Sequence, residues 1–225
     1  MFYSLIASLF CPAAWWGRLR VEGLEHVPET GPLLVVPNHD SQWDPILVGL
    51  AIRPRRRLRF LGRDSLWRIP GLAPILNGLR QIPVRRGAGD AAALERVVAV
   101  LRSGEAVGVF PEGGLSWGEP RRARSGVGLL AAWCPTARIV LCAVEGVTDY
   151  VRFPCRPRVT VSFFAPAGGD PRPGEDPLAC AARLLTELRQ RVPPTPAGRR
   201  AIIGGPPRVR RAMARQSSPN TASQD

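Results

Sequence analysis

The chain has 225 residues, 45% of them hydrophobic, and a formal net charge of +13. This length suits one α/β domain with a substantial core and is short for two domains. The basic excess comes from arginine, since the chain has no lysine, and it favours an anionic partner such as a phospholipid surface, a nucleic acid or a phosphorylated substrate. Five scattered cysteines without a C-x-x-C pair indicate a reducing compartment and argue against a disulfide framework or a cysteine-based metal site.

Residues 1–20 form an apolar segment at the start of the chain. A serine and a proline interrupt its apolar part, which is too short to span a bilayer. No basic residue precedes that part, so we do not expect a secretory signal. Large apolar and tryptophan side chains followed by Arg18 and Arg20 are typical of a segment that lies in the membrane interface. A helix packed on the domain's own core is the alternative.

Residues 21–192 alternate between short apolar runs and segments with helical periodicity. In chain order, the apolar runs predict strands at 33–37, 58–62, 80–84, 106–110, 138–144 and 158–164. The periodic segments predict helices at 45–52, 71–79, 91–102, 126–133 and 177–191. Asp90 is placed to cap the helix at 91–102, and Gly104 is placed to close it. This alternation predicts a single α/β domain with a mostly parallel central sheet flanked by helices.

The first motif is Asn38-His39-Asp40-Ser41-Gln42-Trp43-Asp44-Pro45, which follows the apolar run 33–37. His39 therefore lies at the carboxyl end of a predicted strand, the edge where open α/β sheets bind ligands. Asp44 before Pro45 is predicted to be a helix N-cap followed by the first helical residue. A nearby carboxylate can hold a histidine in one tautomer, so that it acts as a general base near neutral pH. The alternative is a loop histidine beside an ordinary N-cap.

Two more motifs follow this one in the chain. They are Ile82-Pro83-Val84-Arg85-Arg86 and Phe110-Pro111-Glu112-Gly113-Gly114-Leu115-Ser116. Together with Asn38, His39 and Asp44, these runs resemble, in order and spacing, the sequence blocks of the glycerolipid acyltransferase family. The best-known members of that family are the 1-acylglycerol-3-phosphate acyltransferases. The resemblance covers roughly residues 15–165, and residues 19–25 are similar to the family's first strand.

The chain departs from the family's pattern in its later blocks. Gly114 and Leu115 stand where the third block usually carries threonine and arginine, and Arg85 stands where the second block carries an acid. In the fourth block, Leu141 replaces a proline. The histidine block is intact, whereas the blocks that bind the acceptor are altered. The resemblance therefore implies acyl transfer and leaves more than one acceptor open.

The resemblance implies a direct reaction between two bound substrates. His39 would take the proton from the acceptor hydroxyl, and Asp44 would accept a hydrogen bond from the other ring nitrogen. A base positioned in this way contributes roughly 10²–10⁴-fold to the rate. No G-x-S-x-G elbow marks a nucleophilic serine, so an acyl-enzyme is not expected. Acyl-CoA or acyl carrier protein is the expected co-substrate, and no cofactor or metal is expected.

The predicted acceptor site consists of Arg86 and the third block. Arg86 precedes Gly87-Ala88-Gly89 and a helix start, where a guanidinium and backbone N–H groups can hold a phosphate. A solvated arginine is the alternative. The resemblance implies that the block of Glu112, Gly113 and Gly114 organises the acceptor pocket, and the glycines permit close approach of a ligand. A simple loop acid is the alternative for Glu112.

Two further groups of arginines accompany these motifs. Because Leu115 stands in the family's arginine position, the candidates for the missing charge are Arg121, Arg122 and Arg124. A second cluster connects a predicted helix to a strand and consists of Arg53, Arg55, Arg56, Arg57 and Arg59. Membrane headgroups and the phosphates of coenzyme A are the candidate partners of this second cluster. A solvated surface loop is the alternative.

Residues 193–225 are predicted to form a disordered tail rich in proline and arginine. Six arginines and one acid lie within residues 196–225, together with few large apolar residues. The tail is either a tether to anionic lipid, at about 1 kcal/mol per basic residue near the surface, or a solvated end.

The leading expectation is an O-acyltransferase of phospholipid biosynthesis, bound peripherally to anionic lipid at the cytoplasmic face of the membrane. Its acceptor would be a lysophospholipid, foremost 1-acyl-sn-glycerol-3-phosphate. One alternative keeps the enzyme and changes the acceptor to a non-phosphorylated or glycosylated lipid. A further alternative is a non-catalytic protein that binds anionic lipid. No nucleic-acid partner is expected, because the chain has no nucleic-acid-binding motif.

Overall fold

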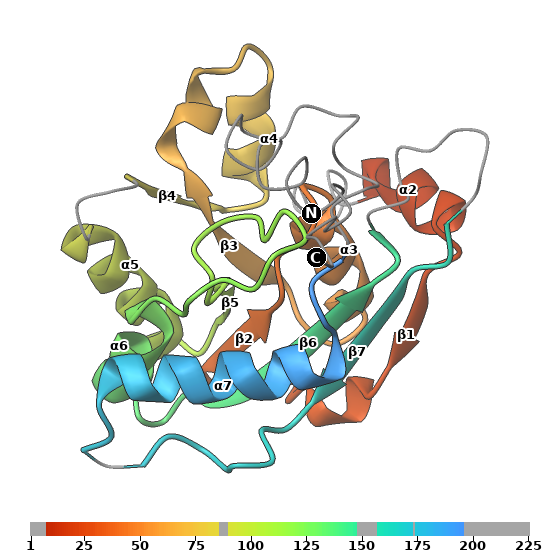
Figure 1. Cartoon of the computed structure of the whole chain (residues 1–225). Coiled ribbons are helices and arrows are strands. Elements are labelled where there is room, and N and C mark those ends of the chain that lie inside the picture. The colour runs from red at the N-terminus through yellow and green to blue at the C-terminus, as the bar shows by residue number, and fades with distance from the viewer. Residues whose placement is uncertain (1–7, 86–89, 148–156, 173, 196–225) are drawn as a thin grey trace, which may run out of the picture.

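Seven strands form one sheet in the computed structural model, which describes residues 8–85, 90–147, 157–172 and 174–195. Their spatial order is β1-β7-β6-β2-β5-β3-β4 (Figure 1). The strands are β1 (Arg20–Glu22), β2 (Leu33–Pro37), β3 (Leu58–Arg63), β4 (Ile82–Val84), β5 (Ala106–Gly108), β6 (Arg138–Glu145) and β7 (Thr160–Phe164). The strands from β6 to β4 are parallel, whereas β7 is antiparallel to β6 and parallel to β1. The predicted mostly parallel α/β sheet is confirmed.

Helices cover both faces of the sheet (Figure 1). They are α2 (Cys11–Trp16), α3 (Asp44–Ile52), α4 (Leu72–Gly78), α5 (Ala91–Arg102), α6 (Gly126–Trp133) and α7 (Pro177–Arg191), with 3-10 turns η1 (Leu24–His26) and η2 (Asp64–Arg68). In β2, Leu34 and Val36 face the core beneath α5, α6 and α7, while Leu33 and Val35 face the core beneath α3. This alternation follows from the two-residue period of a strand. Because both faces are covered, β2 is a continuous apolar run in the sequence.

All the predicted strands and helices are present, with ends displaced by no more than two residues. α5 has its predicted bounds, and the carboxylate of Asp90 accepts the backbone N–H of Ala93 at 3.1 Å, as expected for the cap. The predicted strand at 106–110 ends at Gly108, because the ladder partners of β5 end there. β1, which only the family resemblance indicated, pairs with β7 at the edge of the sheet.

The described part of the N-terminal segment contains α2, which packs against α3. Ala13 and Trp16 contact the core on that side of the sheet, whereas Leu9 and Trp15 are 67% and 70% exposed. The packed-helix alternative therefore holds for one face of the segment, and membrane contact of the other face stays a prediction. Among the described residues, no helix has the length and apolar character needed to cross a bilayer. Residues 1–7 and most of the predicted tail, from residue 196 onward, lie outside the described residues.

Candidate active site

The candidate site lies at the carboxyl edge of the sheet, where two neighbouring strands end. β2 leads into the loop with His39, and β5 leads into the loop with Glu112. Loops that follow adjacent parallel strands meet at this edge, which is the usual ligand-binding edge of such sheets. The two loops are joined directly, because the backbone N–H of Ser116 donates to the carbonyl oxygen of His39 at 2.8 Å.

His39 and Asp44 are brought together as predicted, but Asp44 is not the N-cap of α3. Nδ1 of His39 lies 3.0 Å from Oδ2 of Asp44. The same oxygen accepts the backbone N–H groups of Asp40 at 2.6 Å and Ser41 at 2.7 Å. Trp43 is the N-cap residue and Asp44 is the first helical residue. The N-cap prediction is wrong because the carboxylate turns back into the loop, where three donors together outweigh a single cap bond.

The environment of Asp44 sets the tautomer of the histidine. Burial raises the pKa of Asp44, while the hydrogen bond and charge of His39 and the backbone N–H of Ser41 act in the opposite direction. Oδ2 of Asp44 accepts two backbone N–H groups, so it is an acceptor rather than a protonated oxygen, and it accepts from His39 as well; Nδ1 then carries the proton and Nε2 has the lone pair. Within the described residues, no group hydrogen-bonds Nε2, and Oδ1 of Asp44 is buried without a partner.

An aromatic stack holds the plane of the imidazole. The ring of Phe110 lies against His39 with a centroid distance of 3.9 Å and an interplanar angle of 20°. Phe60 of β3 also stacks with Phe110, with a centroid distance of 5.3 Å. Phe110 begins the third motif, yet its contact with the histidine was not predicted from the sequence.

Buried polar side chains fasten the histidine loop to its neighbours. The side-chain amide of Asn38 donates to the carbonyl oxygen of Val144 at 2.9 Å and accepts the N–H of Val144 at 2.7 Å, which ties the loop to β6. The same amide donates to Asp40, and Asp40 also accepts the hydroxyl of Ser116. Sequence reasoning assigned no role to Asp40 or Ser116, although both lie inside the matched motifs.

Glu112 pairs with Arg189, a residue of α7 that sequence reasoning did not select. Nε of Arg189 lies 2.7 Å from Oε1 of Glu112, and its two terminal nitrogens lie 2.9 and 3.0 Å from the carboxylate oxygens of Asp40. Burial raises the pKa of Glu112, although Arg189 opposes this shift. Burial alone would raise the pKa of Asp40, but the bonds from Arg189, Ser116 and Asn38 outweigh it and lower the pKa. An arginine in a last helical turn is ordinary, so the sequence held no specific signal for Arg189.

Gly113 makes room for a side chain of the same loop. It has a left-handed φ of +64°, and a Cβ atom there would lie 2.4 Å from Cδ of Arg124. A glycine at this position therefore leaves room for the aliphatic part of the Arg124 side chain. The sequence did not suggest this role. Gly114 is buried. Close approach of a ligand to either glycine stays a prediction.

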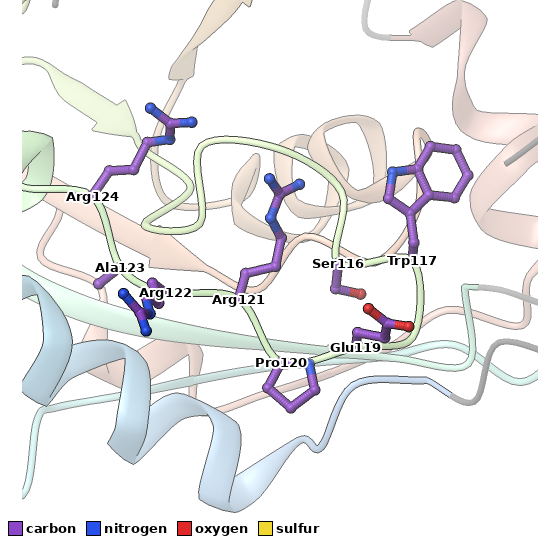
Figure 2. Close-up of a pocket in the computed structure, with 8 residues that line it drawn as sticks. All are labelled: Ser116, Trp117, Glu119, Pro120, Arg121, Arg122, Ala123 and Arg124. Atoms are coloured by element: carbon purple, nitrogen blue, oxygen red, sulfur yellow. The ribbon is translucent and has the colours of Figure 1, made fainter. Parts of the chain in front are cut away.

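A cavity of about 610 Å³ opens beside this loop, and it is lined by Ser116, Trp117 and residues 119–124 (Figure 2). Figure 2 shows Arg121 and Arg124 extending from the same side of the loop, while Arg122 points toward α7. Nη1 of Arg121 lies 2.7 Å from the carbonyl oxygen of Leu115. A guanidinium thus stands beside the position where the family's arginine is missing.

The arginines between α3 and β3 lie at the opposite edge of the sheet from His39, because they precede a strand that runs parallel to β2. Arg56 is buried and donates to the carbonyl oxygens of Gly31 at 3.0 Å and Gly104 at 2.7 Å. Arg59 pairs with Glu105. For Arg56, both the solvated loop and the phosphate partner are wrong, since a buried guanidinium needs the protein acceptors that it has here.

Arg86 and residues 87–89 lie outside the described residues. The preceding residue, Arg85, donates its backbone N–H to the carboxylate of Asp90 at 2.9 Å, so the two sides of this segment are joined. Phosphate binding by Arg86 stays a prediction.

Comparison with known proteins identifies the family. The acyltransferase family model matches residues 18–145, which is more than half of the chain. The chain therefore belongs to the glycerolipid acyltransferase family. It is 38% identical over 99 residues to the 1-acyl-sn-glycerol-3-phosphate acyltransferase alpha of Mus musculus. This aligned stretch covers 43% of this chain and 34% of that relative. The corresponding enzyme of Borreliella burgdorferi is 32% identical over 98 residues, covering 43% of this chain and 38% of that relative.

The other similarities concern a longer stretch and the fold. An uncharacterized protein of Mycobacterium leprae is 31% identical over 144 residues, which is 58% of this chain and 37% of that protein. The chain thus spans less than two fifths of the length of each of these three relatives. The crystal structure of the 1-acyl-sn-glycerophosphate (LPA) acyltransferase PlsC from Thermotoga maritima covers 85% of this chain and 80% of its own, with a TM-score of 0.63. At 20% identity, this likeness shows the fold alone.

Proposed function

We propose that the protein is an O-acyltransferase that moves a fatty acyl chain from acyl-CoA or acyl carrier protein to the hydroxyl group of a lysophospholipid. The names of the similar enzymes favour 1-acyl-sn-glycerol-3-phosphate as the acceptor. One observation carries the proposal. His39 is bound through Nδ1 to Asp44 at 3.0 Å, and its Nε2 has no protein partner among the described residues.

The proposed reaction needs a base and no covalent enzyme intermediate. Nε2 of His39 takes the proton of the acceptor hydroxyl as that oxygen attacks the thioester carbonyl. Asp44 stabilises the imidazolium that forms, as an orienting carboxylate does in hydrolytic triads. The tetrahedral intermediate then collapses, the C–S bond breaks, and the departing thiolate takes the proton from the imidazolium. The products are the ester and the free thiol.

Release of free thiol from acyl-CoA tests the proposal. The purified protein is incubated with acyl-CoA, with and without lysophosphatidic acid, and the lipid products are identified by mass spectrometry. Thiol release that depends on the acceptor and matches ester formation supports the transferase. Binding to anionic vesicles without thiol release on any acceptor of a lysolipid panel would instead support the non-catalytic alternative.

The arginine-lined cavity supports a phosphorylated acceptor. Arg121 reaches back to Leu115, and Arg124 lies against Gly113, so both cations adjoin the third motif. Among the described residues, neither guanidinium forms an ion pair with a carboxylate. Their charge is therefore available to a phosphate that enters the cavity, where an arginine fork suits the oxygens of the group.

Arg121→Gln should raise the Michaelis constant for a phosphorylated lysolipid by about 10- to 150-fold, because a charge-assisted contact is lost. The Michaelis constant for the dephosphorylated counterpart should change little. Arg138→Gln is the matched control, since this exposed arginine begins β6 at the opposite edge of the sheet from His39. Steady-state kinetics with both acceptors measure the difference. If the wild type uses both acceptors equally well, the phosphate assignment is wrong and the neutral or glycosylated acceptor replaces it.

Peripheral contact with anionic membranes is part of the proposal, as the source of the lipid acceptor. The exposed face of the N-terminal segment carries Leu9 and Trp15, and Arg18 is exposed close by. Apolar side chains flanked by basic ones suit an interface with anionic lipid. The side of the membrane stays a prediction from the cysteine content.

Leu9→Ser combined with Trp15→Ser should weaken binding to anionic liposomes by at least about 10-fold, because each large apolar side chain contributes about 1.5–3 kcal/mol when it leaves water. Flotation with liposomes measures the bound fraction. Trp133→Ser is the control, since Trp133 is 40% exposed on α6, away from the N-terminal segment. Binding that is unchanged in the double variant, or that is indifferent to anionic lipid and salt, would contradict the proposal.

A further inference from the structure

We propose that Arg189 of α7 is a positioning residue for His39. In this role it holds the two site loops in the arrangement that keeps the histidine bound to Asp44. The inference rests on the proposed function only in its activity measurement, because its structural part concerns the tautomer of the imidazole.

Arg189 has no hydrogen-bond donor left for a substrate. A guanidinium has five N–H groups, and Arg189 makes five hydrogen bonds: two to Asp40, two to Glu112 and one to the carbonyl oxygen of Val192. Its side chain is 12% exposed. A guanidinium whose donors are all bound to protein oxygens does not bind a phosphate at the same time. Its function therefore lies in the arrangement of the groups that it holds.

The two carboxylates held by Arg189 belong to different loops. Asp40 follows β2 and Glu112 follows β5, and both side chains are almost completely buried. Within the described residues, Arg189 is the cation that forms ion pairs with both. Without Arg189, the two buried carboxylates would repel each other. Either the two loops would then separate, or one of the carboxylates would take up a proton.

A short path of bonds leads from Asp40 to the histidine. Arg189 donates hydrogen bonds of 2.9 and 3.0 Å to the Asp40 carboxylate. The backbone N–H of Asp40 in turn donates to Oδ2 of Asp44 at 2.6 Å. That oxygen is the atom that binds Nδ1 of His39. On the other side, Ser116 donates its hydroxyl to Asp40 and its N–H to the carbonyl oxygen of His39. If Arg189 no longer holds the Asp40 side chain, two contacts of the histidine are weakened. One is the contact of Nδ1 with Asp44, and the other is the contact of the His39 carbonyl oxygen with Ser116.

The test measures turnover and tautomer in Arg189→Gln. We expect kcat to fall by about 10-fold or more, because a charged hydrogen-bonded group is removed. The Michaelis constants of donor and acceptor should change by less than about 3-fold, since no substrate contact is lost. Proton–nitrogen NMR of the two histidines should show the Nδ1–H form of His39 in the wild type and a mixture of tautomers in the variant. His26, which is exposed, is the internal reference.

Two further variants separate positioning from general loss of stability. Asp40→Asn in the Arg189→Gln background removes one uncompensated carboxylate and should recover at least about 3-fold in kcat, since the two positions are directly coupled. Arg183→Gln is the matched control, because Arg183 lies on the same helix and grips Glu175 with bonds of 2.9 Å, away from the site loops. We expect kcat and tautomer of this control to match the wild type. If Arg189→Gln does not fold, Arg189→Lys takes its place, since lysine keeps the charge and loses the fork.

A folded Arg189→Gln or Arg189→Lys protein with wild-type kcat and an unchanged tautomer would overturn the inference. A loss confined to the acceptor's Michaelis constant would also overturn it, because it would place Arg189 among the substrate ligands. If the wild type transfers no acyl group, the proposed function fails separately, and the tautomer measurement still decides the role of Arg189.

Discussion

His39→Ala should reduce kcat by roughly 10²–10⁴-fold, which is the usual contribution of a positioned general base. The physical reason is the orientation of the ring. Asp44 occupies Nδ1 at 3.0 Å, so the acceptor lone pair belongs to Nε2. The fold should persist, because Asn38 holds the same loop to Val144 of β6 without the histidine.

Turnover with saturating acyl-CoA and lysophosphatidic acid measures this effect, and thermal unfolding checks the fold. His26→Ala is the control, since His26 is an exposed histidine of the η1 turn. A folded His39→Ala protein with near-normal turnover would falsify the general-base assignment. The proposed transferase would then need another base, and the histidine would be a loop residue held by an aspartate.

Asp44→Asn should lower kcat by about 10- to 150-fold, because the hydrogen bond to His39 loses the negative charge that makes such a bond worth about 1.5–3 kcal/mol. Two backbone N–H groups, from Asp40 and Ser41, point at Oδ2. They require an oxygen there, so the amide of the asparagine should turn its oxygen to them and its NH₂ group away. That oxygen still accepts Nδ1–H of His39, and the tautomer is kept. The loss then reflects the missing negative charge, which no longer stabilises the imidazolium.

The comparison of Asp44→Asn with Asp44→Ala isolates the two roles of this residue. The alanine variant loses the charge and all three hydrogen bonds, so both kcat and the melting temperature should fall further. Steady-state kinetics and calorimetry of both variants measure the difference. Equal kcat values for wild type and Asp44→Asn would contradict the role of the charge, and an asparagine variant as unstable as the alanine variant would contradict the predicted amide orientation.

Much of the fold was predictable from local patterns. The continuous apolar run of β2, the one-sided apolar face of α5 and the aspartate before it each encode their own backbone, because strand period, helix period and capping act over a few residues. Alternation of strands and helices then favours a parallel sheet. In such a sheet, a residue that directly follows a strand, as His39 does, lies at the carboxyl edge. The pairing of His39 with Asp44 was also predictable, since only a few residues separate them.

Local sequence patterns predicted the wrong hydrogen-bond partners for two side chains. Asp44 has the composition and position of an N-cap, yet its carboxylate binds the loop before it. Arg56 belongs to a run of arginines that suggests a solvated surface, yet main-chain carbonyl groups from distant loops surround it. In both cases the choice between two hydrogen-bonding environments depends on which groups the tertiary structure places nearby.

By itself, the sequence determined the α/β architecture, the family and the pairing of histidine with aspartate, because these depend on periodicity and on short spacings. Only the tertiary structure decided what surrounds that pair. Phe110 meets His39 because β5 lies beside β2, and Arg189 meets Asp40 although 149 residues separate them. Such contacts arise when helices and loops pack on the sheet, and no local period in the chain encodes which side chains then become neighbours.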